Sequence, residues 1–250
     1  MPRPRMHLAA PFATSSVRYN QLDRNLESRS RQRFLERYHS MVRRLMVLLP
    51  AFFALGQGGA PDLDLGSLAS GPFSRMHMLL EKTVFRVDVL TLEVRFGQET
   101  ARRLEETARG KQLSAAIADR IAEAAVDADE AYVDLEFLRG VSLDRWVQGV
   151  RESLTLGRRA GLIDEKTLLH VHRRLPEWFA VVAERGFRKG DQILYRAYPD
   201  RMRTVLISND GRVLLDQVDK GASPGRAMLA GYFAPGTDFR EPLIGSLFER

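Results

Sequence analysis

Three stretches of the chain alternate between apolar and polar residues, namely 76–96, 131–138 and 191–218. A two-residue period places successive side chains on opposite faces of a strand, so each stretch is predicted to be extended. The last stretch contains Asn209-Asp210-Gly211, and Asp-Gly is typical of a type I′ hairpin turn. We therefore expect one or two strands, then a single strand, then a three-stranded meander.

Other stretches repeat apolar residues every three or four positions, which indicates helices. The ranges 98–108 and 112–126 are rich in Ala, Glu and Arg. Ser142 is a suitable N-cap for the next helix. One buried stripe is expected on that helix, formed by Leu143, Trp146, Val147, Val150 and Leu154. A wider set of aromatic residues is expected to be core more readily than a ligand site, namely Trp146, Trp178, Phe179, Phe187 and Tyr195.

A further long helix is expected over about 164–184, with Pro176 kinking or dividing it and Gly186 ending it. From about residue 223 the chain is again expected to be helical. Strands grouped beside helices, without βαβ alternation, predict an α+β fold with an antiparallel sheet.

Charge is distributed unevenly. Residues 1–60 contain ten arginines, no lysine and three acids, a net charge of +7, whereas residues 61–250 contain 28 basic and 29 acidic residues. The predicted domain is therefore close to neutral, which argues against nucleic acid as a partner. The alternative, a nucleic-acid binder using residues 1–60, would show a steep salt dependence.

Residues 41–60 have the order of a secretory signal peptide. A basic stretch at 41–44 precedes the apolar run 45–56, and Gly58 and Ala60 supply small residues before a predicted cleavage at Pro61. On this hypothesis residues 1–40 are an untranslated or disordered Arg-rich extension, and the protein is periplasmic or secreted. The alternative is a buried helix with a basic flank. We expect a linker over 61–74 and a domain over 75–250.

Several chemistries lack their motifs. The chain has no cysteine, no phosphate-binding loop and no Gly-x-Ser-x-Gly. His170 and His172 would diverge on a helix, so we expect no metal and no cofactor. No apolar run reaches the ~20 residues of a membrane-spanning helix, so the mature chain is not expected to span a membrane. The sequence makes no prediction of oligomeric state.

Several blocks of the chain, in their order, are similar to the chalcone isomerase-like family, in particular its bacterial branch. They are FRVDVLTLEVRF (85–96), AYVDLEFLRGVSLDRWVQGVRESL (131–154), GFRKGDQILYRAY (186–198), TVLISNDGRVLLDQV (204–218), SPGRAMLAGYF (223–233) and PLIGSLF (242–248). The resemblance covers about residues 75–250. It implies an open-faced β-sandwich, in which helices back an antiparallel sheet and a ligand cleft lies between them.

The plant enzymes of this family close a phenol onto an enone to form a flavanone. By resemblance, their arginine position falls on Arg75, and their threonine position falls near Asp88. Their tyrosine position falls near Leu143 or Asp144, and their lysine and asparagine positions fall within 146–150, where neither residue occurs. Ring closure needs a polar network for the developing enolate, and these departures remove most of it.

The resemblance therefore favours the non-catalytic relatives that bind fatty acids. We expect a small amphipathic ligand such as a fatty acid, with Arg75 as its anchor and Arg86 and Arg139 as further candidates. A cationic side chain beside an apolar pocket suits a carboxylate-bearing amphiphile. The alternative is an intramolecular lyase or isomerase with a rearranged site, in which a buried Asp88 serves as the base.

Overall fold

The computed structural model describes residues 62–82, 87–221 and 223–249, and it leaves the side chains of residues 81–88 undescribed. The predicted extension 1–40 and the predicted signal peptide 41–60 lie outside the described residues, as does Arg86. Within the described ranges no helix is both long enough and apolar enough to cross a membrane.

Six antiparallel strands form one sheet in chain order. The strands are β1 (Arg75–Lys82), β2 (Val87–Phe96), β3 (Ala131–Phe137), β4 (Gln192–Tyr198), β5 (Arg201–Ile207) and β6 (Val213–Lys220). The range 76–96 thus forms two strands, and the range 191–218 forms the three-stranded meander. Each strand pairs with its neighbour in antiparallel register. The predicted α+β class with an antiparallel sheet is confirmed.

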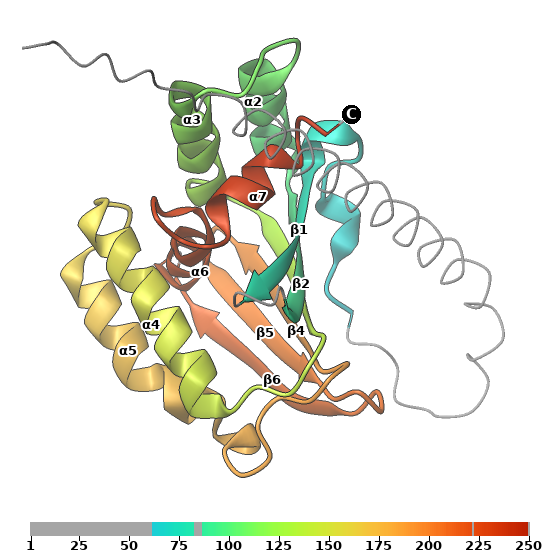
Figure 1. The fold of residues 1–250 in the computed structure, drawn as a ribbon, viewed down its shortest axis with the longest axis vertical. Helices are drawn as coiled ribbons and strands as arrows, with labels where there is room; N and C mark the ends of the chain where they lie inside the picture. Colours follow the sequence, from blue (N-terminus) through green and yellow to red (C-terminus); the bar gives the residue numbers. More distant parts are fainter. Residues whose placement is uncertain (1–61, 83–86, 222, 250) are drawn as a thin grey trace, which may run out of the picture. The chain divides into compact units, whose positions relative to one another are not determined.

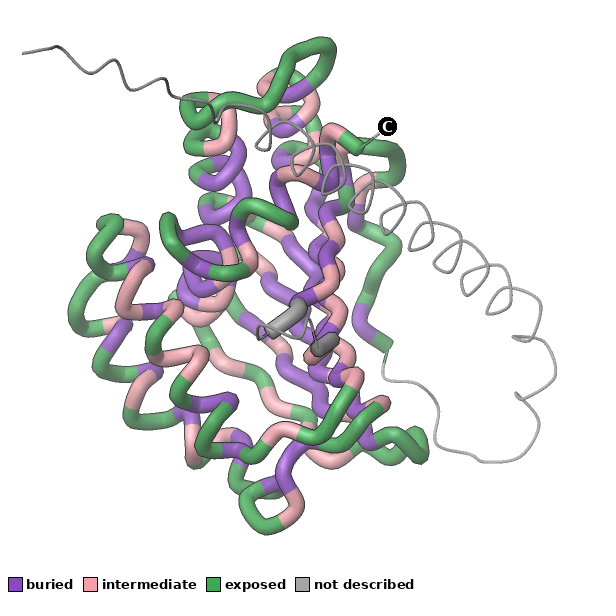
Figure 2. Tube along the Cα trace, viewed as in Figure 1, coloured by how far each residue is buried: buried purple, intermediate pink, exposed green. Residues whose placement is uncertain are grey.

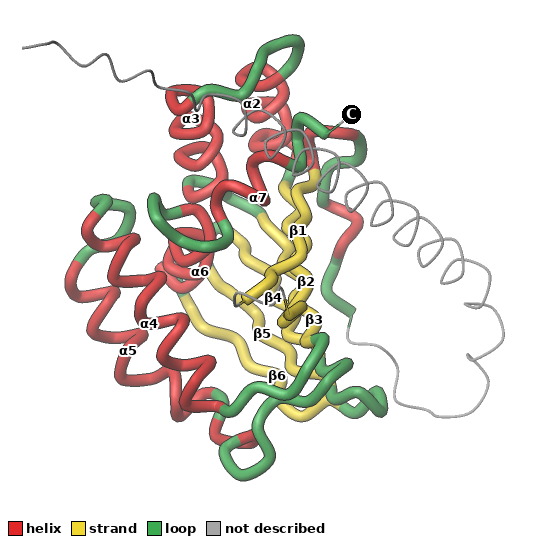
Figure 3. The backbone as a smooth tube through the Cα atoms, in the orientation of Figure 1, coloured by secondary structure: helices red, strands yellow, loops and turns green. Residues whose placement is uncertain are grey.

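The helices cover one face and one end of this sheet (Figures 1 and 3). They are α2 (Gln98–Ala108), α3 (Ala115–Val126), α4 (Leu143–Arg159), α5 (Glu165–Trp178), α6 (Ser223–Phe233) and α7 (Arg240–Gly245), with short 3₁₀ helices at Leu65–Ser67, Pro72–Ser74 and Ala180–Val182. Helix α6 packs directly on β4 and β5, whereas α4 and α5 pack on α6 and on each other. Helix α4 therefore stands away from the sheet.

Local sequence signals explain where α4 and α5 begin and end. Ser142 is the N-cap of α4, as predicted, and its Oγ accepts a hydrogen bond from the Arg145 N–H at 3.4 Å. Helix α5 ends at Trp178, six residues before the predicted end, because Pro176 interrupts its hydrogen bonding. Pro176 has no N–H to donate to the carbonyl of His172, and Arg151 of α4 donates to that carbonyl at 2.7 Å.

The β5–β6 connection differs from the predicted type I′ turn. Gly211 has a φ of +84°, but Asp210 has no positive φ, which a type I′ turn would require of both central residues. The Gly211 N–H donates to the carbonyl of Ser208 at 2.8 Å, and the Ser208 N–H donates to the carbonyl of Arg212 at 2.8 Å. The loop is therefore a three-residue hairpin loop that closes with its glycine in the left-handed region.

The inner face of the sheet, toward the helices, carries the main core (Figure 2). Alternate residues of neighbouring strands are fully buried there, for example Val94, Val133 and Ile193. At one end of this face Phe137 stacks on Phe187 with ring centroids 4.4 Å apart. The alternation seen in the sequence thus separates the two faces of the sheet.

The outer face is partly covered by residues 62–74, most of the range predicted as a linker. Leu63 and Leu68 are buried there against Tyr132, Leu194 and Val205 of the sheet. This range is therefore part of the folded unit and not a spacer. The Gly, Ser and Pro residues of this range predicted a linker, although Leu63 and Leu68 are core residues.

Candidate functional site

A cavity of about 710 Å³ lies between the inner face of the sheet and the helices α4, α5 and α6. Its floor includes Leu90, Leu135 and Phe137, and its helical wall includes Trp146 and Val150. This volume lies within the range of about 300–1,000 Å³ that is typical of small-molecule sites. Of the aromatic residues weighed from the sequence as core or ligand site, four line the cavity, namely Trp146, Trp178, Phe179 and Tyr195.

One end of the cavity is basic. Arg139, in the loop after β3, and Arg145, in the first turn of α4, both line it and are both exposed. Neither guanidinium forms an ion pair or a hydrogen bond with another residue in the described part of the chain. An unpaired guanidinium at the mouth of an apolar cavity is suited to a carboxylate or phosphate.

The other end of the cavity is acidic. Glu152 of α4 and Asp238, in the loop after α6, line it there. Glu152 accepts a hydrogen bond from Gln148 at 2.9 Å. Along α4, Arg145 and Glu152 are seven residues apart, or about 10 Å at ~1.5 Å per residue. The cavity therefore has one basic end, and a second anionic group at the far end would meet like charge.

Polar side chains also lie inside the cavity. Tyr195 of β4 and Thr204 of β5 are directly paired in the sheet, and Thr204 is paired with Gln217 of β6. All three line the cavity together with Tyr232 of α6. Burial raises the pKa of the Tyr195 phenol, the charge of a Tyr232 phenolate would raise it further, and burial also raises the pKa of Tyr232. Tyr232 nevertheless keeps some accessible surface, because it faces the cavity.

The arginines predicted as anchors lie in different places. Arg139 lines the cavity. Arg75 is the first residue of β1, and Leu80 of the same strand faces the cavity. Because successive residues of a strand point to opposite faces, Arg75, five positions before Leu80, lies on the outer face. Arg75 is half exposed and lies 3.4 Å from Glu93. The structure thus does not place the main predicted anchor at the cavity. The backbone of Asp88 belongs to β2, but its side chain is outside the described atoms, so its role as a base stays a prediction.

Arg145 was missed in the sequence. The signal that could have found it is its place in the first turn of α4, three residues after the Ser142 cap and next to Trp146. Arg145 and Arg139 line the same cavity. Thr204 was also not predicted, because it stands within a strand as an ordinary member of the β pattern. Tyr195 was weighed from the sequence only as an aromatic side chain, without a role for its hydroxyl.

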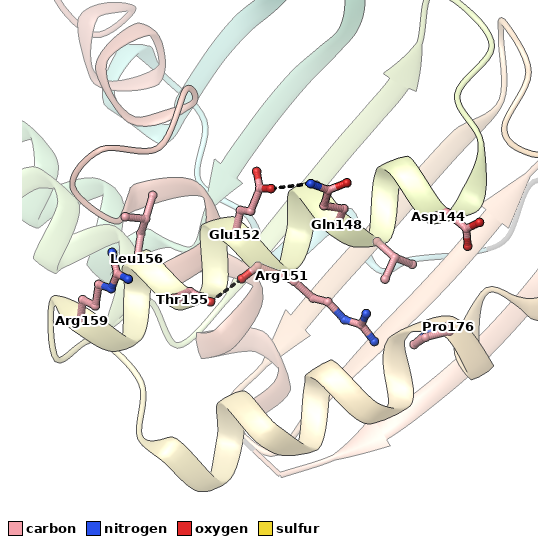
Figure 4. Close-up of a pocket in the computed structure, with 9 residues that line it drawn as sticks. Asp144, Gln148, Arg151, Glu152, Thr155, Leu156, Arg159 and Pro176 are labelled. Atoms are coloured by element: carbon pink, nitrogen blue, oxygen red, sulfur yellow. Dashed lines mark hydrogen bonds between the residues drawn. The ribbon is translucent and has the colours of Figure 1, made fainter.

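A second hollow, of about 670 Å³, lies on the outward side of α4 (Figure 4). Its polar groups are largely engaged by the fold. Arg151 reaches across to α5, where it donates to the His172 carbonyl near Pro176, and Thr155 donates to the Arg151 carbonyl at 2.8 Å. We therefore assign this hollow to the packing of α4 on α5. Among the described residues there is also no group of three or more His, Asp or Glu side chains that could hold a metal ion.

No family model matches the chain, and no curated protein matches it. Among solved structures, the fatty-acid binding protein of Arabidopsis thaliana is similar to it, with 14% sequence identity and a TM-score of 0.44. The match covers 70% of this chain and 91% of the Arabidopsis chain. A likeness at this score supports no argument about function, so the function has to be inferred from the geometry of the cavity.

Proposed function

We propose that this protein binds a small amphipathic ligand with one anionic head group, such as a fatty acid. The ligand's apolar chain lies in the cavity between the sheet and the helices, and its head group lies at the basic end. The polarity of the cavity supports a monoanion, because Glu152 and Asp238 disfavour a second anionic group at the other end.

The observation that carries this proposal is the pair Arg139 and Arg145. Both line the rim of a largely apolar cavity, and no described acidic residue is paired with either of them. Surface arginines elsewhere on the domain are often paired, as Arg158 is with Glu165 at 3.1 Å. A carboxylate is the group that two free guanidiniums would bind with charge-assisted hydrogen bonds.

The test is direct binding of hexadecanoic acid to the full chain, measured by calorimetry. We expect binding in the wild type and a loss of affinity of about tenfold or more in Arg139→Gln/Arg145→Gln, because charge-assisted hydrogen bonds contribute ~1.5–3 kcal/mol each. Hexadecanedioic acid should bind more weakly than hexadecanoic acid. The matched control is Arg173→Gln, an exposed arginine on α5 that does not line the cavity.

Two results would overturn the proposal. One is the absence of any binding of hexadecanoic acid to the wild type. The other is an equal loss of affinity in the double variant and in Arg173→Gln, which would indicate only a general effect of surface charge.

Three finer statements belong to the same proposal. We infer membership of the chalcone isomerase-like family from the order of the sequence blocks, and lack of catalysis from the missing tyrosine, lysine and asparagine. We infer export from the pattern of residues 41–60, which lie outside the described residues. Activity as an isomerase through Asp88 stays the alternative prediction.

A further inference from the structure

The interior of the cavity contains three hydroxyl groups that the fold itself does not use. Tyr195 is 7% exposed and Thr204 is 2% exposed, and both face the cavity beside Tyr232. No hydrogen bond joins any of these three hydroxyls to another described residue. None of the three hydroxyl oxygens is among the buried side-chain atoms that lack a partner, so each is accessible from the cavity and takes its hydrogen-bond partner from whatever occupies the cavity.

Packing alone does not explain the three hydroxyls. Phenylalanine or valine would fill the same volumes without the cost of an unpaired polar group. The outer side of the same strand shows the ordinary solution, since the Tyr198 hydroxyl lies 3.4 Å from the Leu63 carbonyl, to which it donates. The unused hydroxyls on the inner side therefore indicate a partner that occupies the cavity.

The chemistry of that partner follows from the donors. The raised pKa values of Tyr195 and Tyr232 keep both phenols protonated at neutral pH, so each donates a hydrogen bond. The three residues carry no charge, and the cavity's arginines lie at its rim, so nothing at this position would stabilise a buried anion. A plain hydrocarbon chain would leave the donors unpaired.

We propose that Tyr195, Thr204 and Tyr232 form a second subsite, inside the cavity, for a neutral acceptor oxygen on the chain of the ligand. This oxygen belongs to a carbonyl, an ether or a hydroxyl group, so the ligand is an oxygenated amphiphile and not a simple saturated acid. The inference deepens the proposed function, which supplies the anionic head group, and it adds a requirement on the chain.

The test compares octadecanoic acid with a series of oxo-octadecanoic acids whose carbonyl moves from the fourth to the fourteenth carbon. Calorimetry with the full-length wild type should show a gain of about threefold to tenfold for a narrow range of carbonyl positions, as expected for one or two neutral hydrogen bonds. Tyr195→Phe, Tyr232→Phe and Thr204→Val should each reduce the ratio of the affinity for the best oxo acid to the affinity for octadecanoic acid, because each removes a donor that only the oxo acid can use. Tyr198→Phe is the matched control and should keep the gain.

A neutral ligand separates this inference from the proposed function. Heptadecan-9-one has the carbonyl but no head group, so its binding does not depend on Arg139 or Arg145. If no acid binds but this ketone binds, and Tyr195→Phe and Tyr232→Phe weaken it, the head-group assignment fails and the subsite stands. Equal affinity for all the acids, or no effect of the tyrosine variants on a bound ketone, would overturn the subsite, and so would a failure of every oxygenated ligand to bind.

Discussion

The two faces of the sheet differ in whether their polar side chains have partners within the protein. On the outer face, charged side chains have partners within the protein, such as Arg203 with Asp216 at 2.7 Å and Arg95 with Glu93 at 2.5 Å. On the inner face, the hydroxyls of Tyr195 and Thr204 face the cavity, and neither they nor the rim arginines Arg139 and Arg145 have a partner among the described residues. The outer face is therefore complete as a folded surface, whereas the inner face has donors left for a ligand.

The buried arginine Arg196 is the strongest example on the outer face. Its guanidinium is fully buried and donates to Glu130 at 2.7 Å, to the Ser67 hydroxyl at 2.6 Å and to the Ala197 carbonyl at 2.9 Å. It also lies 4.3 Å from the centre of the Tyr198 ring. This network attaches residues 62–68 to the sheet, so it stabilises the fold and leaves nothing to bind.

The largest effect is expected from Glu130→Ala. Glu130 supplies the negative charge for Arg196, and this interaction with Arg196, followed by that with Ser67, lowers the pKa of the Glu130 carboxyl. Removing it leaves a fully buried cation without its counter-charge, so the free energy of unfolding should fall by ~3 kcal/mol. Urea denaturation followed by circular dichroism measures the change.

The control for this variant is Asp216→Ala on the same face. The pair of Arg203 and Asp216 is partly exposed, with 28% and 39% of the two side chains accessible, so its loss should cost less than ~1 kcal/mol. Losses of similar size in the two variants would contradict the view that Arg196 is the main attachment of residues 62–68.

A smaller effect is expected at Asp134, an outer-face acid that has no ion pair with any described residue. Burial, and to a smaller extent the neighbouring charges of Glu93 and Glu136, raise the pKa of the Asp134 carboxyl to about 6. The unfolded value is ~3.9, so the folded state binds a proton more tightly. The stability that this group contributes is therefore present below pH ~4 and is lost as the pH rises to about 6.

Asp134→Asn should remove this pH dependence. At pH 8 the variant should be more stable than the wild type by ~1–2 kcal/mol, and at pH 4 the two should be nearly equal. Urea denaturation at several pH values between 4 and 8 provides the comparison. A variant that is less stable than the wild type at pH 8 would show that the ionised carboxylate stabilises the fold. That result would contradict the prediction that burial makes the ionised form destabilising.

The difference between the faces also explains which features the sequence could predict. The alternation in 131–138 and the cap at Ser142 are local, so the strand and the helix start followed from them directly. A role for the hydroxyls of Tyr195 and Thr204 could not be predicted from the sequence, because it depends on the register that pairs these residues beside the cavity. The register of β1 likewise decides that Arg75 faces outward, and a one-residue change in register would have reversed it.

Long-range pairing accounts for the remaining differences. The buried positions of Leu63 and Leu68 depend on contacts with strands more than sixty residues away, which no local pattern shows. The resemblance to a known family implied a cleft between sheet and helices, and it placed the family's arginine position on Arg75, which lies on the outer face. Arg139, a further candidate, lines the cavity, and its role as an anchor stays a prediction. The resemblance suggested no role for Arg145, because that residue was not among the family's polar positions.

The smallest effect is expected at Gly149, which faces the cavity from the middle of α4. A Cβ added there meets no other atom within 4 Å, whereas at Gly157 of the same helix it would lie 3.4 Å from the Cβ of Ala230 on α6. Gly149→Ala should therefore raise the free energy of unfolding by ~0.5–1 kcal/mol through helix propensity alone. Gly157→Ala should gain less, because α6 has to move slightly to accept it.

Gly149 also allows a test of whether the empty space belongs to a ligand. Gly149→Leu places a larger apolar side chain in the cavity without a backbone clash, so it should fold with at least wild-type stability and should weaken the binding of hexadecanoic acid. Thermal unfolding and calorimetry measure the two effects on the same preparation. If Gly149→Leu binds the acid as tightly as the wild type, the chain of the ligand does not lie against α4, and the inner face has to bind it elsewhere.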